Sequence, residues 1–391
     1  MALASPITPV TPATAPPSWN PLKFRGTPLP TELLILVKVL ALVVLLVNHV
    51  RILPDPWLPF VPGVDRIPPI LFQRTLQTVF VTCALALLFN RRVRLASLVI
   101  GATMLIAVVS SKAYYGNNKT FCALMFFLTG LYVPGRKPWM LQWQLGLTYF
   151  GAGLNKLLDA DWHSGVFFEN WAVNRLHQPW YMALNSVLPP MVLARLMCWS
   201  TIVTELAVVP AIFIRRFQPW AAYANILFQS GLLLFTGSTF TLFFYSMSAA
   251  SLAFVTWPAE PVTVGYDIDS GLVNRIRKVL QFCDADRRFC WTPHSRDVGD
   301  WFHLPIGNRV YTNFRALRMM VLLNPITYLA IATLIAPVAD VPAAAAYRRV
   351  VVGSCLFFLM PALAWIADRI LGRRQPVRLA TTGVANRVTD I

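Results

Sequence analysis

Residues 93–111 read VRLASLVIGATMLIAVVSS, an apolar run with a single charged side chain, Arg94. A helix needs about 20 predominantly apolar residues to cross a bilayer, so this stretch predicts a membrane span. Comparable runs lie near 32–50, 70–89, 119–133, 139–157, 191–214, 217–236 and 239–257. The sequence therefore predicts an all-α polytopic membrane bundle with about eight transmembrane helices.

The composition agrees with a membrane protein. Hydrophobic residues make up 56% of the 391 residues and charged residues only 13%, whereas soluble domains carry about 25% charged residues. The net charge of +17 comes from basic residues in short loops between apolar runs, which is typical of cytoplasmic loops rather than of nucleic-acid binding. We therefore expect membrane lipids as partners and no nucleic acid.

Three basic clusters fix the expected orientation. They follow the second, fourth and sixth apolar runs, at Arg91–Arg94, Arg136–Lys137 and Arg215–Arg216. Because loops rich in Lys and Arg stay in the cytoplasm, these three loops, the N-terminus and residue 258 are all expected inside. The eight prolines in residues 1–30 predict a disordered cytoplasmic tail before a membrane domain at 31–257.

The chain after residue 257 is more polar. We expect a cytosolic segment at 258–349, followed by an apolar helix and a basic tail at 350–391. Two apolar runs, 319–338 and 350–367, add either two further spans, making ten, or none. The six cysteines form no CxxC pair and three lie in predicted spans, so neither a disulfide framework nor a metal site is indicated.

Polar residues inside the predicted spans are candidates for function, because such groups are costly in a bilayer. Gln142, Tyr149 and Lys156 are spaced seven apart and share one helical face, beside Gly146, Ala152 and Gly153, which allow a close neighbour. Lys156 either snorkels and pairs with Asp159 or Asp161, or serves a buried site.

Two further spans contribute polar residues. Asn225 and Gln229 lie on one face, and they either bind a ligand or hold helices together by hydrogen bonds. Glu205 needs a cationic partner, for which Lys38 and Arg74 are candidates. Trp162, Trp171 and Trp180 are more typical of interfacial anchors than of a binding platform.

One of these segments resembles a known family. The run Tyr149-Phe150-Gly151-Ala152-Gly153-Leu154-Asn155-Lys156-Leu157, followed by Trp162 and Gly165, closely resembles a motif of the vitamin K-dependent γ-carboxylase and of bacterial horizontally transferred transmembrane (HTTM) proteins. Asn117-Asn118-Lys119-Thr120 resembles the family's Asn-Asn-His-Ser, and Phe228-Gln229 resembles its Phe-His. The resemblance covers roughly residues 30–257.

The resemblance implies quinone-linked chemistry. It gives Lys156 the role of the base that deprotonates a reduced quinone, menaquinone or vitamin K-like, and places Lys119 where the family has a histidine. The large outward region that binds the carboxylase's peptide substrate has no counterpart, which argues against peptide carboxylation. The implied catalytic residues are Lys156 and Lys119, and the implied ligand-binding residues are Tyr149, Gln142, Asn117, Asn118, Trp162, Glu205, Asn225 and Gln229.

The cytosolic segment resembles a second family. Val264-Gly265-Tyr266-Asp267-Ile268-Asp269-Ser270-Gly271-Leu272-Val273-Asn274-Arg275 is similar to the opening of DCC-type thiol–disulfide oxidoreductase domains, with Ser270 and Val273 in place of the two cysteines. The resemblance implies a small α/β thioredoxin-like remnant. Since a thiol pair is the whole chemistry of such a site, we expect this one to be redox-inactive.

Three functional hypotheses remain open at this point. The chain is a quinone-dependent membrane oxidoreductase or carboxylase-like enzyme, a non-catalytic membrane scaffold or partner subunit of the same fold, or a lipid or small-molecule transporter. The enzyme hypothesis expects Lys156, Tyr149, Lys119 and Gln229 to line one outward-opening cavity, and the scaffold hypothesis lets them scatter.

Overall fold

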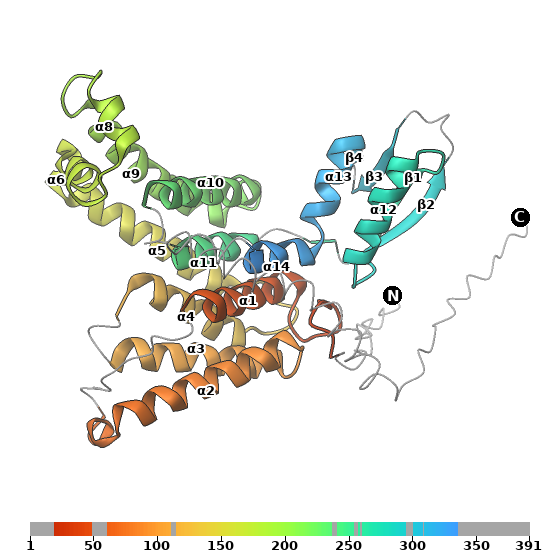
Figure 1. Cartoon of the computed structure of the whole chain (residues 1–391), viewed down its shortest axis with the longest axis horizontal. Coiled ribbons are helices and arrows are strands. Elements are labelled where there is room, and N and C mark those ends of the chain that lie inside the picture. Colours follow the sequence, from red (N-terminus) through yellow and green to blue (C-terminus); the bar gives the residue numbers. More distant parts are fainter. Residues whose placement is uncertain are drawn as a thin grey trace, which may run out of the picture.

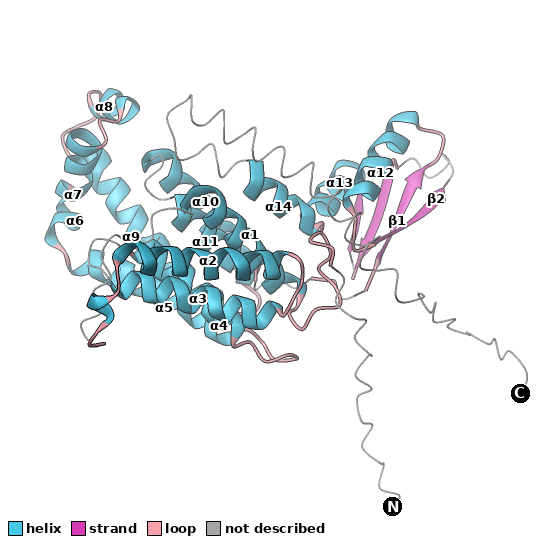
Figure 2. Cartoon of the chain, turned by 60° about the horizontal axis from the view of Figure 1, so that its bottom comes forward, coloured by secondary structure: helices cyan, strands magenta, loops and turns pink. Residues whose placement is uncertain are grey.

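The apolar runs of the sequence form long helices in the computed structural model of the chain (Figure 1). The structure describes residues 19–48, 61–110, 115–236, 241–253, 257–258, 260–294, 300–307 and 309–334. The expected apolar helix at 350–367 and the basic tail lie outside these residues. Figure 2 shows two parts within them: a large bundle of helices and, beside it, a small sheet with its own helices.

The helices of the bundle coincide with the predicted apolar runs. They are α1 (Thr31–Val43) with the π-helical turn η1 (Val44–Asn48), α2 (Pro69–Leu88), α3 (Val93–Ser110), α4 (Asn117–Gly130), α5 (Trp139–Leu158), α9 (Val192–Phe213), α10 (Gln218–Thr236) and α11 (Thr241–Leu252). Between α2 and η1 lies the short 3-10 helix η2 (Val64–Arg66). Short helices α6 (Ala160–Ser164), α7 (Val166–Asn170), η3 (Trp171–Arg175) and α8 (Pro179–Asn185) join α5 to α9.

By length and composition, three of the described helices can cross a membrane: α2, α3 and α9. A fourth span would exist only if α13 (Asn313–Leu322) and α14 (Pro325–Leu334) acted together, and these two are bent by 72°. The chain is thus a largely helical protein with membrane-spanning helices, and the predicted count of eight spans exceeds what these helices establish. Helices α5 and α10 are long enough to cross a membrane, with 20 and 19 residues. They are not among the three because several amide side chains make them less apolar.

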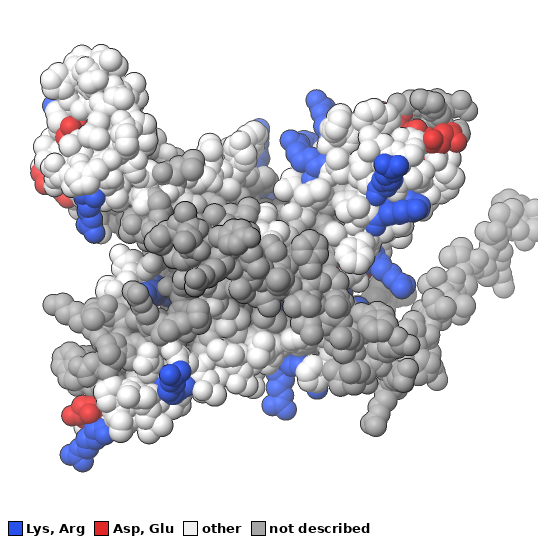
Figure 3. All heavy atoms as spheres, viewed as in Figure 1, with Lys and Arg blue, Asp and Glu red and all other residues white. Residues whose placement is uncertain are grey.

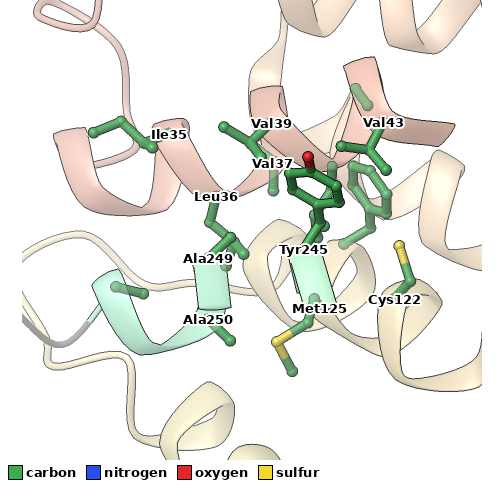
Figure 4. Packing of buried hydrophobic residues seen from close by; sticks show 14 of the residues in the cluster. Ile35, Leu36, Val37, Val39, Val43, Cys122, Met125, Tyr245, Ala249 and Ala250 are labelled. Atoms are coloured by element: carbon green, nitrogen blue, oxygen red, sulfur yellow. The ribbon is translucent and has the colours of Figure 1, made fainter. Parts of the chain in front are cut away.

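Helix α1 lies at the centre of the bundle. Every residue from Leu33 to Val43 is buried, and its neighbours are α4, α11 and α14. Figure 4 shows its aliphatic side chains beside Tyr245 and Ala249 of α11, and Met125 of α4 belongs to the same buried cluster. An almost wholly apolar helix is typical of a protein core or a membrane span, and here α4, α11 and α14 cover it.

The segment before α1 is packed, in contrast to the expected disorder over residues 1–30. The side chains of Leu22, Phe24 and Leu29 are buried. The fully buried Lys38 of α1 donates from Nζ to the carbonyls of Pro21 (2.6 Å) and Lys23 (3.1 Å). The expectation of disorder is therefore wrong for residues 19–30.

The second part is a four-stranded sheet in the order β2-β1-β3-β4. Strands β1 (Val262–Asp267) and β2 (Phe289–His294) are parallel and joined by α12 (Gly271–Cys283), whereas β3 (Phe302–Ile306) and β4 (Arg309–Thr312) are antiparallel additions. Helices α12 and α13 cover the same face of the sheet, because residues of both pack into one cluster with Val264 and Leu304.

The apolar run 319–338 is divided between the two parts. Its first residues end α13, which packs on β3 and β4, and α14 packs on α1 in the bundle. Asn324 makes the break, since its Oδ1 accepts from the backbone N–H of Ile326 (3.1 Å) and Pro325 begins the next helix. The run is therefore neither a continuous membrane span nor wholly part of the sheet domain.

Candidate functional site

Helices α5 and α9 approach each other closely, and glycine allows it. A Cβ built on Gly153 would lie 2.8 Å from Leu206 and 3.3 Å from the Cβ of Glu205, and one built on Gly146 would lie 2.9 Å from Phe213. The predicted close neighbour of this small-residue face is therefore α9. The contact brings Lys156, one turn beyond Gly153, alongside Glu205.

Lys156 and Glu205 form an ion pair. Lys156 Nζ lies 2.7 Å from Glu205 Oε2 and 2.9 Å from Oε1, and the two side chains are only 18% and 8% exposed. The ammonium also stands 5.0 Å from the ring centroid of Trp162. Both charges are thus satisfied at a largely desolvated point between two helices.

This pair replaces the pairings expected from sequence. Asp159 accepts from the backbone N–H of Asp161 (2.9 Å) and caps α6, so it stabilises a helix end rather than Lys156. Lys38, a candidate partner for Glu205, binds backbone carbonyls on the other side of the bundle core. Neither Asp159, Asp161, Lys38 nor Arg74 is the partner that the structure gives to Lys156 or Glu205.

The ion pair lies in the wall of a cavity of about 1000 Å³. Aromatic and aliphatic side chains form most of this wall, with a few polar groups from α4, η3 and α9. The lining residues are Asn117, Asn118, Ala152, Lys156, Trp162, Phe167, Phe168, Asn170, Trp171, Arg175, Leu176, Trp180, Met197, Ser200, Thr201, Glu205, Phe228, Gly231, Leu232, Phe235 and Phe243.

Stacked aromatic rings build part of the wall and pack in one cluster with residues of α9. Trp162 and Phe167 are stacked with centroids 4.3 Å apart, and Phe168 and Phe235 are stacked at 4.7 Å. Trp171 and Trp180 lie 5.3 and 5.7 Å from Phe235. All three tryptophans of this region thus line the cavity, a placement typical of a binding platform and different from the preferred interpretation as interfacial anchors.

Tyr149, Asn225 and Gln229 form a separate, buried hydrogen-bond network. Tyr149 donates from its hydroxyl to Asn225 Oδ1, and Gln229 Nε2 donates to the Tyr149 hydroxyl at 2.9 Å. Asn225 Nδ2 donates to the Met247 carbonyl at 2.8 Å, which ties α10 to α11. None of the three is among the described residues that line the cavity, so they hold helices together.

The predicted polar face of α5 is divided among different neighbours. Gln142 donates from Nε2 to the Ile212 carbonyl (2.5 Å) near the end of α9. Tyr149 turns to α10 and Lys156 to Glu205. Helical spacing placed the three on one face, and the structure gives each a separate partner.

Only part of the Asn117-Asn118-Lys119 segment lines the cavity. Asn117 and Asn118, at the start of α4, line the cavity, while Lys119, partly buried, is not among its described lining residues. Four residues were expected to line one cavity: Lys156, Tyr149, Lys119 and Gln229. Among the described residues that line this cavity, only Lys156 is one of these four.

Several lining residues were missed by the sequence analysis. They are chiefly the aromatic and polar residues Phe167, Phe168, Asn170, Arg175, Ser200 and Phe235. The density of aromatic residues between Trp162 and Trp180 was the available signal, because ligand cavities are lined mostly by apolar and aromatic side chains.

Comparison with known proteins gives one family match. Residues 127–257 match the model of the HTTM domain, whereas the curated proteins and the solved structures contain no match to the chain. The matched region begins late in α4 and extends just beyond α11, so it includes Lys156, Glu205 and the Tyr149 network. Residues 127–257 are therefore similar to the HTTM domain, and this similarity together with the apolar helices indicates a membrane protein.

Proposed function

We propose that the chain binds a lipid-soluble, flat aromatic ligand of the quinone type in the cavity beside α5 and α9. The observation that supports the proposal is the Lys156–Glu205 ion pair set into an aromatic wall. Ligand sites in proteins are mostly apolar cavities with a few convergent polar groups. This cavity has that composition, and its charged pair is placed to exchange a proton with a bound hydroxyl.

The residues present fit a quinone such as menaquinone or a vitamin K-like compound. A volume of about 1000 Å³ is at the upper end of the range for cavities that hold small molecules. The ring of Trp171 would pack on a planar head group, and Asn117, Asn118 and Thr201 offer hydrogen bonds. When bound, a reduced quinone supplies hydroxyl protons and reducing electrons.

We assign the two residues of the pair different parts in the proposed proton chemistry. Lys156 donates to both oxygens of Glu205, so the ammonium carries the proton and the carboxylate carries the free lone pairs. In our proposal Glu205 accepts the hydroxyl proton of the ligand and becomes a neutral acid, while the Lys156 ammonium holds the anion that forms. The resemblance implies Lys156 as the base; here it stabilises charge.

A second candidate function is a non-catalytic scaffold or partner subunit in the membrane. The sheet domain supports it, because its β-α-β-β-β-α order with strand order β2-β1-β3-β4 is compatible with the α/β remnant that the resemblance to DCC-type domains implies. In that interpretation Ser270 and Val273 occupy the positions of the thiols, and Ser270 caps α12 by accepting from the Val273 N–H (3.4 Å). A domain without its thiols is suited to binding rather than to redox chemistry.

We also propose that the sheet domain and the N-terminus are cytoplasmic. The guanidinium of Arg91 lies 3.8 Å from the ring centroid of Trp19, and Phe24 N donates to Asp286 of the sheet domain at 2.8 Å. The Arg91–Arg94 turn, the N-terminal segment and the sheet domain therefore share one end of the bundle. Since basic turns stay in the cytoplasm, this end is the inner one.

The test is mass spectrometry of lipids that copurify with the detergent-extracted chain. The proteins are the wild type, Lys156→Met, Glu205→Gln and the matched control Lys137→Met, whose exposed lysine lies in the α4–α5 loop. The proposal expects a quinone to copurify with the wild type and with the control. In both site variants the amount of copurifying quinone should fall about tenfold. No quinone with any of them would overturn it in favour of the scaffold, and a retained phospholipid would indicate a transporter.

A further inference from the structure

Helices α12 and α13 of the sheet domain expose apolar side chains on the face that points away from the sheet. On α12 these are Leu272, Val279 and Phe282, and on α13 they are Phe314 and Leu322. Phe282 and Phe314 are each 71% exposed. Because the opposite faces of both helices pack on the sheet through residues such as Val273 and Ala316, these side chains form one outer surface, here called the helix face.

Basic residues lie among the exposed apolar ones. Arg275 and Lys278 on α12, and Arg315 and Arg318 on α13, are all exposed, and neither helix contains an acidic residue. Within the described chain, none of these four side chains forms an ion pair. Figure 3 shows the Lys and Arg atoms spread over α12 and α13, with the acidic atoms of this part at its far end.

The helix face lies next to the membrane-spanning bundle. Helix α13 continues into α14 after a bend of 72°, and α14 packs on the central helix α1. Figure 1 shows α13 on the side of the sheet domain nearer the bundle, with the sheet beyond it. Arg288 Nη2 also donates to Thr31 Oγ1 at the start of α1, so the domain is fastened where the bundle ends.

We propose that the helix face binds the anionic phospholipid headgroups of the membrane that holds the bundle. Exposed arginines and lysines around protruding phenylalanines are the composition of interfacial helices, whose apolar side chains enter the headgroup region while the basic ones bind lipid phosphates. The cytoplasmic leaflet is the anionic one, and the proposed orientation of the chain places the sheet domain there. The domain then lies flat on the bilayer, held by α14 on one side and by this face below.

The charge pattern distinguishes this partner from a protein. A protein-binding surface of a small domain normally has few charges at its centre, whereas here basic side chains lie between the exposed apolar ones on both helices. The open face of the sheet, with Thr263, Thr292 and Val310, carries no such pattern. The bilayer that surrounds the bundle also lies next to the sheet domain, so this partner is always at hand for the helix face.

The experiment uses the full chain in nanodiscs. An environment-sensitive fluorescent amino acid is incorporated in place of Phe314, of Phe282 or, as the matched control, of Val310 on the open sheet face, which is also exposed. Discs contain either zwitterionic lipid alone or a mixture with phosphatidylglycerol, and lipids brominated near the glycerol backbone serve as quenchers. We expect quenching at positions 314 and 282 to be about twofold or more above that at position 310, in the anionic discs.

Charge reversal supplies the second measurement. Arg315→Glu/Arg318→Glu should abolish the difference between the positions, whereas Arg309→Glu on β4 should leave it unchanged, because Arg309 is exposed but lies outside the helix face. Equal quenching at all three positions overturns the proposal, and so does equal quenching at positions 282 and 314 in zwitterionic and anionic discs. A blue-shifted emission without quenching by brominated lipid also overturns it, in favour of a protein partner. None of these readouts depends on a ligand in the cavity, so the proposed function can fail separately.

Discussion

Lys156 on α5 donates to both carboxylate oxygens of Glu205 on α9, at 2.9 and 2.7 Å, although the two residues are 49 positions apart in the chain. The pair lines the aromatic cavity and also joins two long helices that pack closely at Gly153. It therefore contributes both to the proposed ligand chemistry and to the packing of the bundle, and variants must separate the two contributions.

The first prediction concerns the stability that this pair confers. Lys156→Met and Glu205→Gln each leave one charge without its counterion in a desolvated place, so each should lower the free energy of unfolding by about 2–4 kcal/mol. The double variant Lys156→Met/Glu205→Leu leaves no unpaired charge and should be more stable than either single variant. Thermal unfolding in detergent, followed by tryptophan fluorescence, ranks the three. A double variant less stable than both single ones would contradict the prediction.

The second prediction concerns the glycines of α5. Gly153→Ala places a Cβ 2.8 Å from Leu206, so it should separate α5 from α9 and lower the free energy of unfolding by about 1–3 kcal/mol. Gly151→Ala is the matched control, because nothing lies within 4 Å of its Cβ and alanine favours the helix by about 0.5–1 kcal/mol. The two substitutions should shift the melting temperature in opposite directions. Equal shifts would show that helix contact at Gly153 is unimportant.

The helices of the bundle were predictable from sequence because their ends carry strong local signals. The run 93–111 became Val93–Ser110, and the run 191–214 became Val192–Phe213. Arginines precede the first, and Arg215 and Arg216 follow the second. The break within 319–338 carried a signal as well, in Asn324 and Pro325, but only packing shows that α13 joins the sheet and α14 the bundle.

The partners of the polar residues could not be predicted in the same way. The spacing of Gln142, Tyr149 and Lys156 correctly indicated a shared face, yet which helix meets that face depends on packing far along the chain. Glu205 illustrates this, since Lys38 and Arg74 were its expected partners, whereas the structure pairs it with Lys156 and places Lys38 beside the Pro21 and Lys23 carbonyls. The cavity itself lies between the long helices and the short helices that follow α5, and this arrangement depends on contacts between segments far apart in the chain.

The third prediction separates the buried network from the cavity. Tyr149→Phe removes the donor to Asn225 Oδ1 and the acceptor for Gln229 Nε2, and unsatisfied buried groups cost about 1–3 kcal/mol each. The variant should melt at a lower temperature while retaining whatever lipid copurifies with the wild type. Tyr223→Phe, on the exposed side of α10, should change neither. A loss of the lipid at unchanged stability would instead place Tyr149 in the ligand site.

The last prediction concerns residues 19–30, which contact both the helix bundle and the sheet domain. Lys38 holds the carbonyls of Pro21 and Lys23, and Asp286 accepts from the Phe24 N–H at 2.8 Å. Lys38→Met leaves the two carbonyls without their buried donor, which favours release of residues 19–30. Trypsin should then cleave after Lys23 and Arg25 about tenfold faster than in the wild type, because proteolysis follows the population of the open form. Mass spectrometry of the released N-terminal peptides gives the rate, with Lys137→Met as the control that should leave it unchanged. An unchanged rate in Lys38→Met would mean that Asp286 and the packing of Phe24 hold the segment without the lysine.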